Sequence, residues 1–193
     1  MSERIQNDAY FTPPTLAQAI VARLVERHLL RVGQRVWEPH AGAGSFARAL
    51  AAQSGAFVYA SDISPDMPSG DELEAHGIAG WKASHNALAG WWLDDGPPDW
   101  IVGNPPFSEA EEHVRALLPI ARYGVAFITR QSFTATAKRA DLARQVWQVW
   151  PINPRPSFTP DGKTDACEYN VVLFVKNHGL AERPIDPITW IKP

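Results

Sequence analysis

The sequence predicts an α/β fold with a mostly parallel central sheet, helices on both faces and an antiparallel strand near the C-terminus. Segments with apolar residues at helical spacing alternate along the chain with short runs of β-branched and aromatic residues. Such alternation is typical of parallel strands joined by crossover helices. The last clear strand pattern follows a proline-rich stretch, residues 151–162, and is expected to be the antiparallel one.

The expected elements follow in chain order. A helix is predicted over residues 15–30, ending near Gly33, because apolar residues recur there every three or four positions. Short strands are expected at residues 35–37, 57–61, 99–103, 124–129 and 168–176. Further helices are expected from Ser45, whose hydroxyl could cap the start, and at residues 111–121 and 139–150, the last stopped by Pro151. Most tryptophans are expected to be packing groups: Trp81, Trp91, Trp92, Trp147 and Trp150.

Length and composition indicate one domain over residues 1–193. The chain is 45% hydrophobic and 20% charged, which is enough to build a core. Its single cysteine, Cys167, excludes an internal disulfide, and the sequence has neither a charged-then-apolar leader nor an apolar run near about 18 residues. A reducing compartment, the cytoplasm, is therefore expected.

Charge is unevenly distributed along the chain, although the net charge is only -3. Residues 115–163 hold eight Lys or Arg against two acids, which is +6, and the remainder holds 10 against 19. This asymmetry suits one cationic face that would attract a polyanion. The competing interpretation is a solvated helix face together with scattered loop charges.

A glycine-containing turn between a strand and a helix occupies residues 36–50. The strand ends in Glu38 and Pro39, and Gly42 and Gly44 follow, where they allow positive φ and close approach of a ligand to the backbone. Asp62 stands 20 residues after Gly42 at the end of the next strand, where an acid can bind ribose hydroxyls. This pattern indicates an adenosine-containing cofactor, and both NAD and S-adenosylmethionine fit it.

The segment Asn-Pro-Pro-Phe, residues 104–107, directly follows the strand at residues 99–103. In open α/β sheets ligands bind outside the carboxyl ends of the strands, so this position favours a site. Together with residues 10–14 (YFTPP) and 38–44 (EPHAGAG), and in this order, the segment resembles the motifs of amino-group DNA methyltransferases, chiefly N6-adenine enzymes. The resemblance implies the Rossmann-like class I methyltransferase fold and S-adenosylmethionine as cofactor, and makes NAD a distant second.

The resemblance also implies roles for individual residues. Tyr10, Phe11, Thr12 and Pro13 resemble the motif beside the methionine moiety, and Glu38, His40, Gly42 and Gly44 would surround methionine and ribose. Asp62 would bind the ribose diol, Ile63 would pack on the cofactor adenine, and Asn86 stands where the family usually has an Asp contacting that adenine. His40 departs from the small residue often found at its position, which favours a structural or cofactor-shaping role.

The Asn-Pro-Pro-Phe segment has a chemical rationale. The exocyclic amine of adenine is a poor nucleophile, and the side-chain oxygen of Asn104 and the carbonyl of Pro105 could accept its two N–H groups. Pro105 and Pro106 fix the backbone that presents these acceptors, and Phe107 could stack on a flipped base. A catalytic base with a shifted pKa is not needed, because the proton can leave after methyl transfer.

Few residues remain after the catalytic motifs, so no separate target-recognition domain and only modest specificity are expected. Candidate phosphate contacts are Lys138, Arg139, Arg144, Arg155 and Lys163. A small enzyme of this kind resembles phage or prophage methyltransferases. No metal is expected, because Cys167 and the histidines His28, His76, His113 and His178 lack ligand spacing. Methylation of structured RNA, of a protein glutamine or of cytosine, or a non-catalytic binder, stay open.

Overall fold

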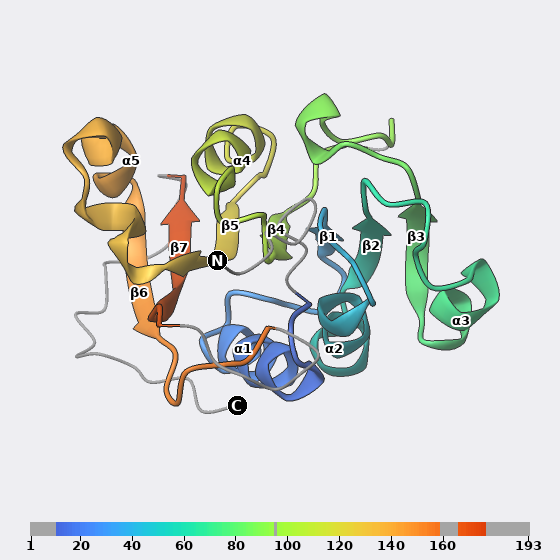
Figure 1. Ribbon diagram of the computed structural model, residues 1–193. Helices are drawn as coiled ribbons and strands as arrows, with labels where there is room; N and C mark the ends of the chain where they lie inside the picture. The colour runs from blue at the N-terminus through green and yellow to red at the C-terminus, as the bar shows by residue number, and fades with distance from the viewer. Residues whose placement is uncertain (1–10, 95, 159–165, 177–193) are drawn as a thin grey trace.

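The computed structural model describes residues 11–94, 96–158 and 166–176. A seven-stranded sheet runs through the molecule in the order β3-β2-β1-β4-β5-β7-β6 (Figure 1). The strands β1 to β5 pair in parallel, and β7 is antiparallel to both of its neighbours, β5 and β6. The strands are β1 Arg35–Glu38, β2 Phe57–Ser61, β3 Ile78–Lys82, β4 Trp100–Gly103, β5 Gly124–Arg130, β6 Val146–Pro151 and β7 Tyr169–Val175. The predicted mixed sheet with an antiparallel strand near the C-terminus is confirmed.

Helices lie on both faces of the sheet, as predicted. Figure 1 shows α1, α2 and α3 on one side and α4 and α5 on the other. Their bounds are α1 Pro14–Glu26, α2 Ser45–Ser54, α3 Gly70–Ala75, α4 Ala110–Leu117 and α5 Ala140–Ala143, with short 3-10 turns η2 Ala87–Ala89, η3 Gln131–Ala135 and η4 Ala137–Arg139. No helix in the described part of the chain is long and apolar enough to cross a membrane.

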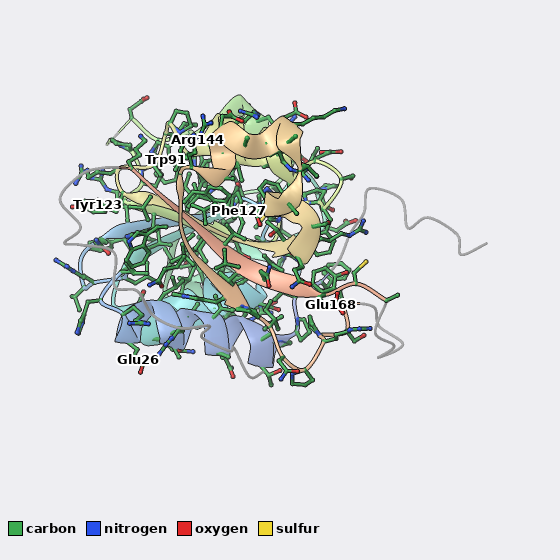
Figure 2. All side chains as sticks on the ribbon, turned by 90° about the vertical axis from the view of Figure 1, so that its left-hand side faces the viewer. Glu26, Trp91, Tyr123, Phe127, Arg144 and Glu168 are labelled. Carbon is green, nitrogen blue, oxygen red and sulfur yellow. The ribbon has the colours of Figure 1, made fainter. Side chains whose placement is uncertain are left out.

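Two apolar cores, one on each face, hold the layers together. Successive residues of a strand point to opposite faces, and β5 shows this directly: Ala126 and Ile128 belong to the core with α1 and α2, whereas Val125 and Phe127 belong to the core with α4. Figure 2 shows Phe127 in the interior and Glu26 on the α1 side of the sheet. Burial on both faces explains why the central strands read as continuous apolar runs.

An aromatic loop covers part of the α4 face. Trp91 and Trp92 pack against the fully buried Trp37 of β1, with ring centroids 5.4 and 5.6 Å apart, and the Trp91 indole N–H donates to the carbonyl of Gly96. Trp150 is buried, and Trp81 and Trp147 pack against the other core. The prediction that these tryptophans are packing groups is confirmed.

Three predictions about elements were wrong. The helix expected at residues 139–150 is the single turn α5 followed by the strand β6, because the β-branched and aromatic residues from Val146 onward pair with β7. Ser45 does not cap α2: it is the first helical residue, and Gly44 with φ 79° precedes it. The first helix ends at Glu26, earlier than residue 30.

Candidate active site

The order of the strands reverses between β1 and β4, which creates a crevice at their carboxyl ends. The two strands are parallel neighbours, with Val36 opposite Trp100 and Trp37 opposite Ile101. The chain therefore leaves β1 at Glu38 and β4 at Gly103 side by side. A Cβ atom added to Gly103 would lie 3.7 Å from Cδ of Pro39. The structure thus brings together the two sequence motifs that follow these strands, at the point where open α/β sheets bind ligands.

The loop after β1 is held by Asp62, which follows β2. The Gly42 N–H donates to Oδ2 of Asp62 and the Ser64 N–H donates to Oδ1, both at 2.8 Å. Gly42 and Gly44 have φ values of 49° and 79°, so the predicted need for glycine here is confirmed. Each carboxylate oxygen of Asp62 keeps further lone-pair capacity, because an ionised carboxylate can accept about four hydrogen bonds.

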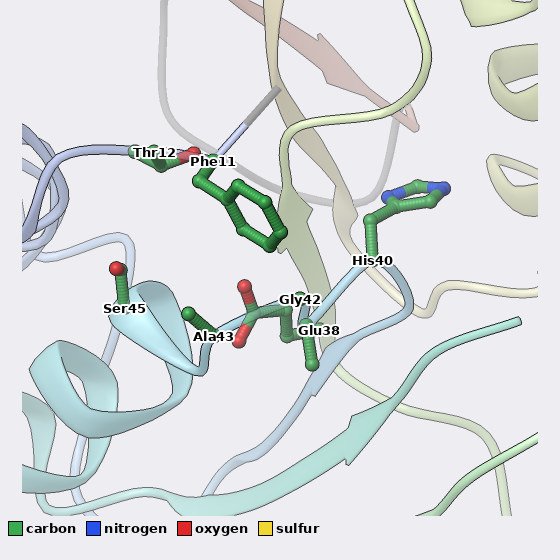
Figure 3. Close-up of a pocket in the computed structure, with 8 residues that line it drawn as sticks. Phe11, Thr12, Glu38, His40, Gly42, Ala43 and Ser45 are labelled. Carbon is green, nitrogen blue, oxygen red and sulfur yellow. The ribbon is translucent and has the colours of Figure 1, made fainter. Parts of the chain in front are cut away.

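A pocket opens beside this loop (Figure 3). Its lining residues are Phe11, Thr12, Glu38, His40, Ala41, Gly42, Ala43 and Ser45. Figure 3 shows the Glu38 carboxylate below the ring of Phe11. The His40 ring points away from both of them. A Cβ atom on Gly42 would lie 3.3 Å from the Phe11 ring, so glycine keeps the floor of the pocket close to that ring.

Glu38 is the most unusual group in the pocket. The residue is 1% exposed, and its Oε2 has no hydrogen-bond partner among the described residues. Burial raises the pKa of this carboxyl well above its ordinary value of 4.5, and the charge of Asp62 acts in the same direction, whereas the Ala47 main-chain N–H opposes it. An isolated buried carboxylate is costly, so the arrangement favours a ligand that brings positive charge or a hydrogen-bond donor to Oε2.

The remaining predicted cofactor residues differ in their exposure and in the hydrogen bonds that they already make. Ile63 and Phe11 are apolar yet 63% and 51% exposed, which leaves both available to an apolar ligand surface. Asn86 is exposed, and its Oδ1 already accepts the Leu88 N–H at 2.9 Å at the start of η2. Pro13 precedes the first residue of α1, and Thr12 lines the pocket. Tyr10 lies outside the described residues.

The loop after β4 presents its first residues at the same crevice. Asn104 and Pro105 are buried, and the Pro106 carbonyl accepts the Glu109 N–H at 2.9 Å, which forms the turn before α4. Phe107 is half-buried among aromatic rings, with centroid distances of 4.9 Å to Tyr169 and 5.6 Å to Phe158. The Arg130 guanidinium lies 5.6 Å from the centre of the Phe107 ring.

Arg130, at the end of β5, was not among the predicted site residues. The sequence counted it only within the cationic segment, because its nearness to Phe107 depends on how β5 and the loop after β4 are placed. A cation over an aromatic face is an attractive arrangement and also suits a phosphate beside a stacked base.

The predicted phosphate contacts do not form one cluster. Arg139 is partly covered: it packs 4.7 Å from the Phe133 ring centre and lies 3.7 Å from Glu111, and Arg155 pairs with Glu168 at 2.8 Å. Lys138 and Arg144 are exposed. Arg144 stands just before β6, which starts level with the amino end of β5 across β7, so Arg144 lies toward the end of the sheet opposite the crevice. Figure 2 shows Arg144 on the side of the sheet away from α1. Lys163 lies outside the described residues.

A pair of histidines joins the loop after β1 to helix α4. Nε2 of His40 lies 2.9 Å from Nδ1 of His113 in α4, and His113 is 5% exposed. Burial lowers the pKa of His40 well below 6.5, with the charge of His113 adding to the effect, and burial also lowers the pKa of His113. The sequence did not indicate this pairing, because His40 and His113 are 73 positions apart.

Comparison with solved structures identifies the fold. The chain resembles a type I restriction-modification methyltransferase subunit from Streptococcus thermophilus (TM-score 0.65, 14% identity), with 89% of this chain covering 46% of that one. It also resembles magnesium protoporphyrin IX methyltransferase from Synechocystis with bound S-adenosylmethionine (TM-score 0.60, 20% identity, covering 84% and 79%). A third similar structure is the 23S rRNA methyltransferase ErmE (TM-score 0.58, 18% identity, covering 84% and 70%).

The fold is therefore the Rossmann-like class I methyltransferase fold. This chain spans about half of the Streptococcus subunit. No protein-family model matches the sequence, and no curated protein sequence matches it. At these identities the likeness shows the fold, and the chemistry must be argued from the site.

We expect Glu38→Gln to change how stability depends on pH. The folded-state pKa of Glu38 is raised, so above about pH 4.5 the folded protein binds more protons than the unfolded chain, and the free energy of unfolding falls as pH rises toward the raised pKa. Glutamine does not titrate. The variant should therefore gain stability relative to the parent as the pH rises from about 4.5 toward the raised pKa of Glu38, by up to about 1.4 kcal/mol per pH unit.

Urea unfolding of both proteins across this pH range measures the difference. Glu74→Gln, at an exposed glutamate of α3, is the matched control and should show a flat difference. A difference between Glu38→Gln and the parent that does not change with pH would contradict the assignment of a buried, raised-pKa carboxyl.

Proposed function

We propose that this protein transfers a methyl group from S-adenosylmethionine to the exocyclic N6 amine of adenine in DNA, with base flipping and low sequence specificity. The observation that carries the proposal is the meeting, at the crevice between β1 and β4, of the glycine loop after Glu38 with the Asn104–Phe107 loop. One loop suits an adenosine cofactor, and the other suits a planar amine.

The pocket residues fit this cofactor. The buried Glu38 oxygen, which lacks a hydrogen-bond partner among the described residues, would take the ammonium of the methionine moiety, and Asp62 would accept the ribose hydroxyls. Phe11 and Ile63 offer exposed apolar surface to the rest of the molecule. S-adenosylmethionine supplies an electrophilic sulfonium methyl group when bound. Ammonium binding at Glu38 would also stabilise the ionised carboxylate.

The loop after β4 would prepare the amine. The Asn104 side-chain oxygen and the Pro105 carbonyl can each accept one N–H of the base, which draws electron density onto the nitrogen and stabilises the charge that develops during transfer. The prolines restrict the backbone at residues 104–106, so the acceptors need little reorganisation. The methylated nitrogen then loses its proton to solvent.

The target base would reach the amine acceptors only outside its duplex. The exposed part of the Phe107 ring can stack on a flipped base, an interaction worth about 1–3 kcal/mol. Arg130 beside this ring and the exposed Lys138 would then contact the flanking phosphates, as would Arg155. Phosphate contacts position a strand and carry no base information, which is the reason for expecting a short or relaxed sequence preference.

Asp62→Ala should weaken binding of S-adenosylmethionine at least tenfold. The substitution removes an acceptor for the ribose hydroxyls, and hydrogen bonds to charged groups contribute about 1.5–3 kcal/mol. Titration calorimetry measures the affinity. Asp66→Ala, at an exposed acid four positions away, is the control and should bind like the parent. Unchanged affinity in Asp62→Ala, or tighter binding of NAD than of S-adenosylmethionine by the parent, would rule out this cofactor assignment.

Asn104→Ala should separate catalysis from cofactor binding. The lost acceptor acts mainly in the transition state, so the turnover number should fall about 100- to 1,000-fold while cofactor affinity stays nearly unchanged. Asn104→Asp keeps an acceptor oxygen and should retain more activity than the alanine variant. Single-turnover methyl transfer with labelled cofactor is the measurement, and a fully active Asn104→Ala protein would refute the mechanism.

DNA binding should weaken steeply with salt. If Arg130 and Lys138 each neutralise one phosphate, replacing both with alanine should flatten the slope of log K against log salt by about 1.8 units. The control replaces Arg122 and Arg144, which lie toward the end of the sheet opposite the crevice. This double variant should leave the slope nearly unchanged. Equal changes in both double variants would contradict the proposed phosphate path.

Nucleoside analysis after incubation with labelled cofactor identifies the target. N6-methyladenine in DNA supports the proposal, whereas N4-methylcytosine would move the target base. Label that enters structured RNA or a protein glutamine instead of DNA would replace the proposed polymer. Label in none of these substrates, with cofactor binding intact, would favour a non-catalytic binder.

A further inference from the structure

His40 contacts the elements that surround Asn104. Its Nε2 lies 2.9 Å from Nδ1 of His113 in α4, and its ring packs edge-on against Phe127 of β5 at a centroid distance of 5.5 Å. A Cβ atom on Gly103, the residue before Asn104, would lie 3.2 Å from Nδ1 of His40. Glycine at position 103 therefore makes room for the ring, and the ring in turn limits where the end of β4 can lie.

The histidine pair extends from the loop after β1, residues 39–44, to the surface of α4. We call this loop the cofactor loop. His113 is almost fully buried, and its Nε2 lies 3.8 Å from Oε2 of the exposed Glu109. Among the described residues, the titratable groups that act on the two rings are each other, Glu109 and Glu112. Glu109 also donates its main-chain N–H to Pro106, so the same turn of chain links the histidine pair to the Asn104–Phe107 loop.

The protonation state decides whether the pair can form its hydrogen bond. Between two neutral imidazoles one ring donates and the other accepts, and the bond survives when one ring gains a second proton. When both rings are protonated, only donors face each other and the charges repel. Because burial lowers both pKa values, the neutral pair is the state at neutral pH.

We propose that His40 and His113 are positioning residues whose hydrogen bond fixes the end of β4, and with it Asn104, relative to the cofactor loop. The catalytic consequence rests on the proposed function, because it requires Asn104 to accept the substrate amine. The distance between the bound cofactor and the amine acceptors of the Asn104–Phe107 loop would then depend on the His40–His113 hydrogen bond, which contacts neither the cofactor nor the base.

The structural part of the proposal is tested without substrate. The side-chain amide signals of Asn104 in nitrogen-15 NMR spectra should shift as the histidine rings titrate below about pH 6.5. His40→Leu should move these signals at every pH. The double variant His40→Gln with His113→Asn replaces each bonding nitrogen by an uncharged amide at the same reach, so it should keep the parent signals and remove their pH dependence.

The catalytic part is tested by turnover and cofactor KM. In His40→Leu the turnover number should fall about 10- to 100-fold, as expected for a misplaced reacting group, while KM for S-adenosylmethionine changes little. The double amide variant should recover most of the turnover and lose the acid limb of the parent's pH profile. Phe127→Leu trims the packing against His40 without touching the hydrogen bond, and should lower stability with little effect on turnover.

The outcomes distinguish failure of the positioning proposal from failure of the proposed function. Asn104 signals that ignore both the histidine titration and His40→Leu would overturn the positioning proposal, whatever the activity. Asn104 signals that respond as expected in a protein that methylates no substrate would support the coupling and overturn the proposed function instead. Turnover in His40→Leu equal to that of the parent would overturn the catalytic role of the pair.

Discussion

The parallel pairing of β1 with β4 is the constraint on which the site depends. These strands are separated by two others in the chain but adjacent in the sheet, so their following loops emerge together. Glu38 and Asn104 belong to sequence motifs 66 positions apart by number, and only this pairing makes them neighbours in one crevice. The two apolar cores, one on each face, stabilise the sheet with the strands in this order.

Buried polar groups beside the crevice give the site its chemical character. Glu38 has an oxygen without a hydrogen-bond partner in the described part of the chain, and the His40–His113 pair is held neutral by burial. Such groups lower the stability of a fold unless a ligand or a partner compensates. Their position beside the glycine loop, rather than elsewhere in the core, is consistent with a cost that is offset when a cofactor binds.

Local patterns predicted the parts of this structure that local physics controls. Gly42 and Gly44 had to permit positive φ, and β4 and β5 had to read as apolar runs, because both faces of the sheet are covered. Residues 146–151 were assigned to a helix because their apolar spacing fits a helix as well as a strand. Their antiparallel pairing with β7 makes them a strand. Neither the histidine pair nor the nearness of Arg130 to Phe107 could be read from the sequence, since both depend on tertiary placement.

We propose above all that the cofactor loop and the Asn104 loop form one site. A crystal structure with S-adenosylhomocysteine tests it most directly. We expect the ligand's ammonium at Glu38, its ribose hydroxyls at Asp62 and its sulfur directed toward Asn104 across the crevice. A ligand bound elsewhere, or bound with its sulfur turned away from the Asn104–Phe107 loop, would contradict the claim.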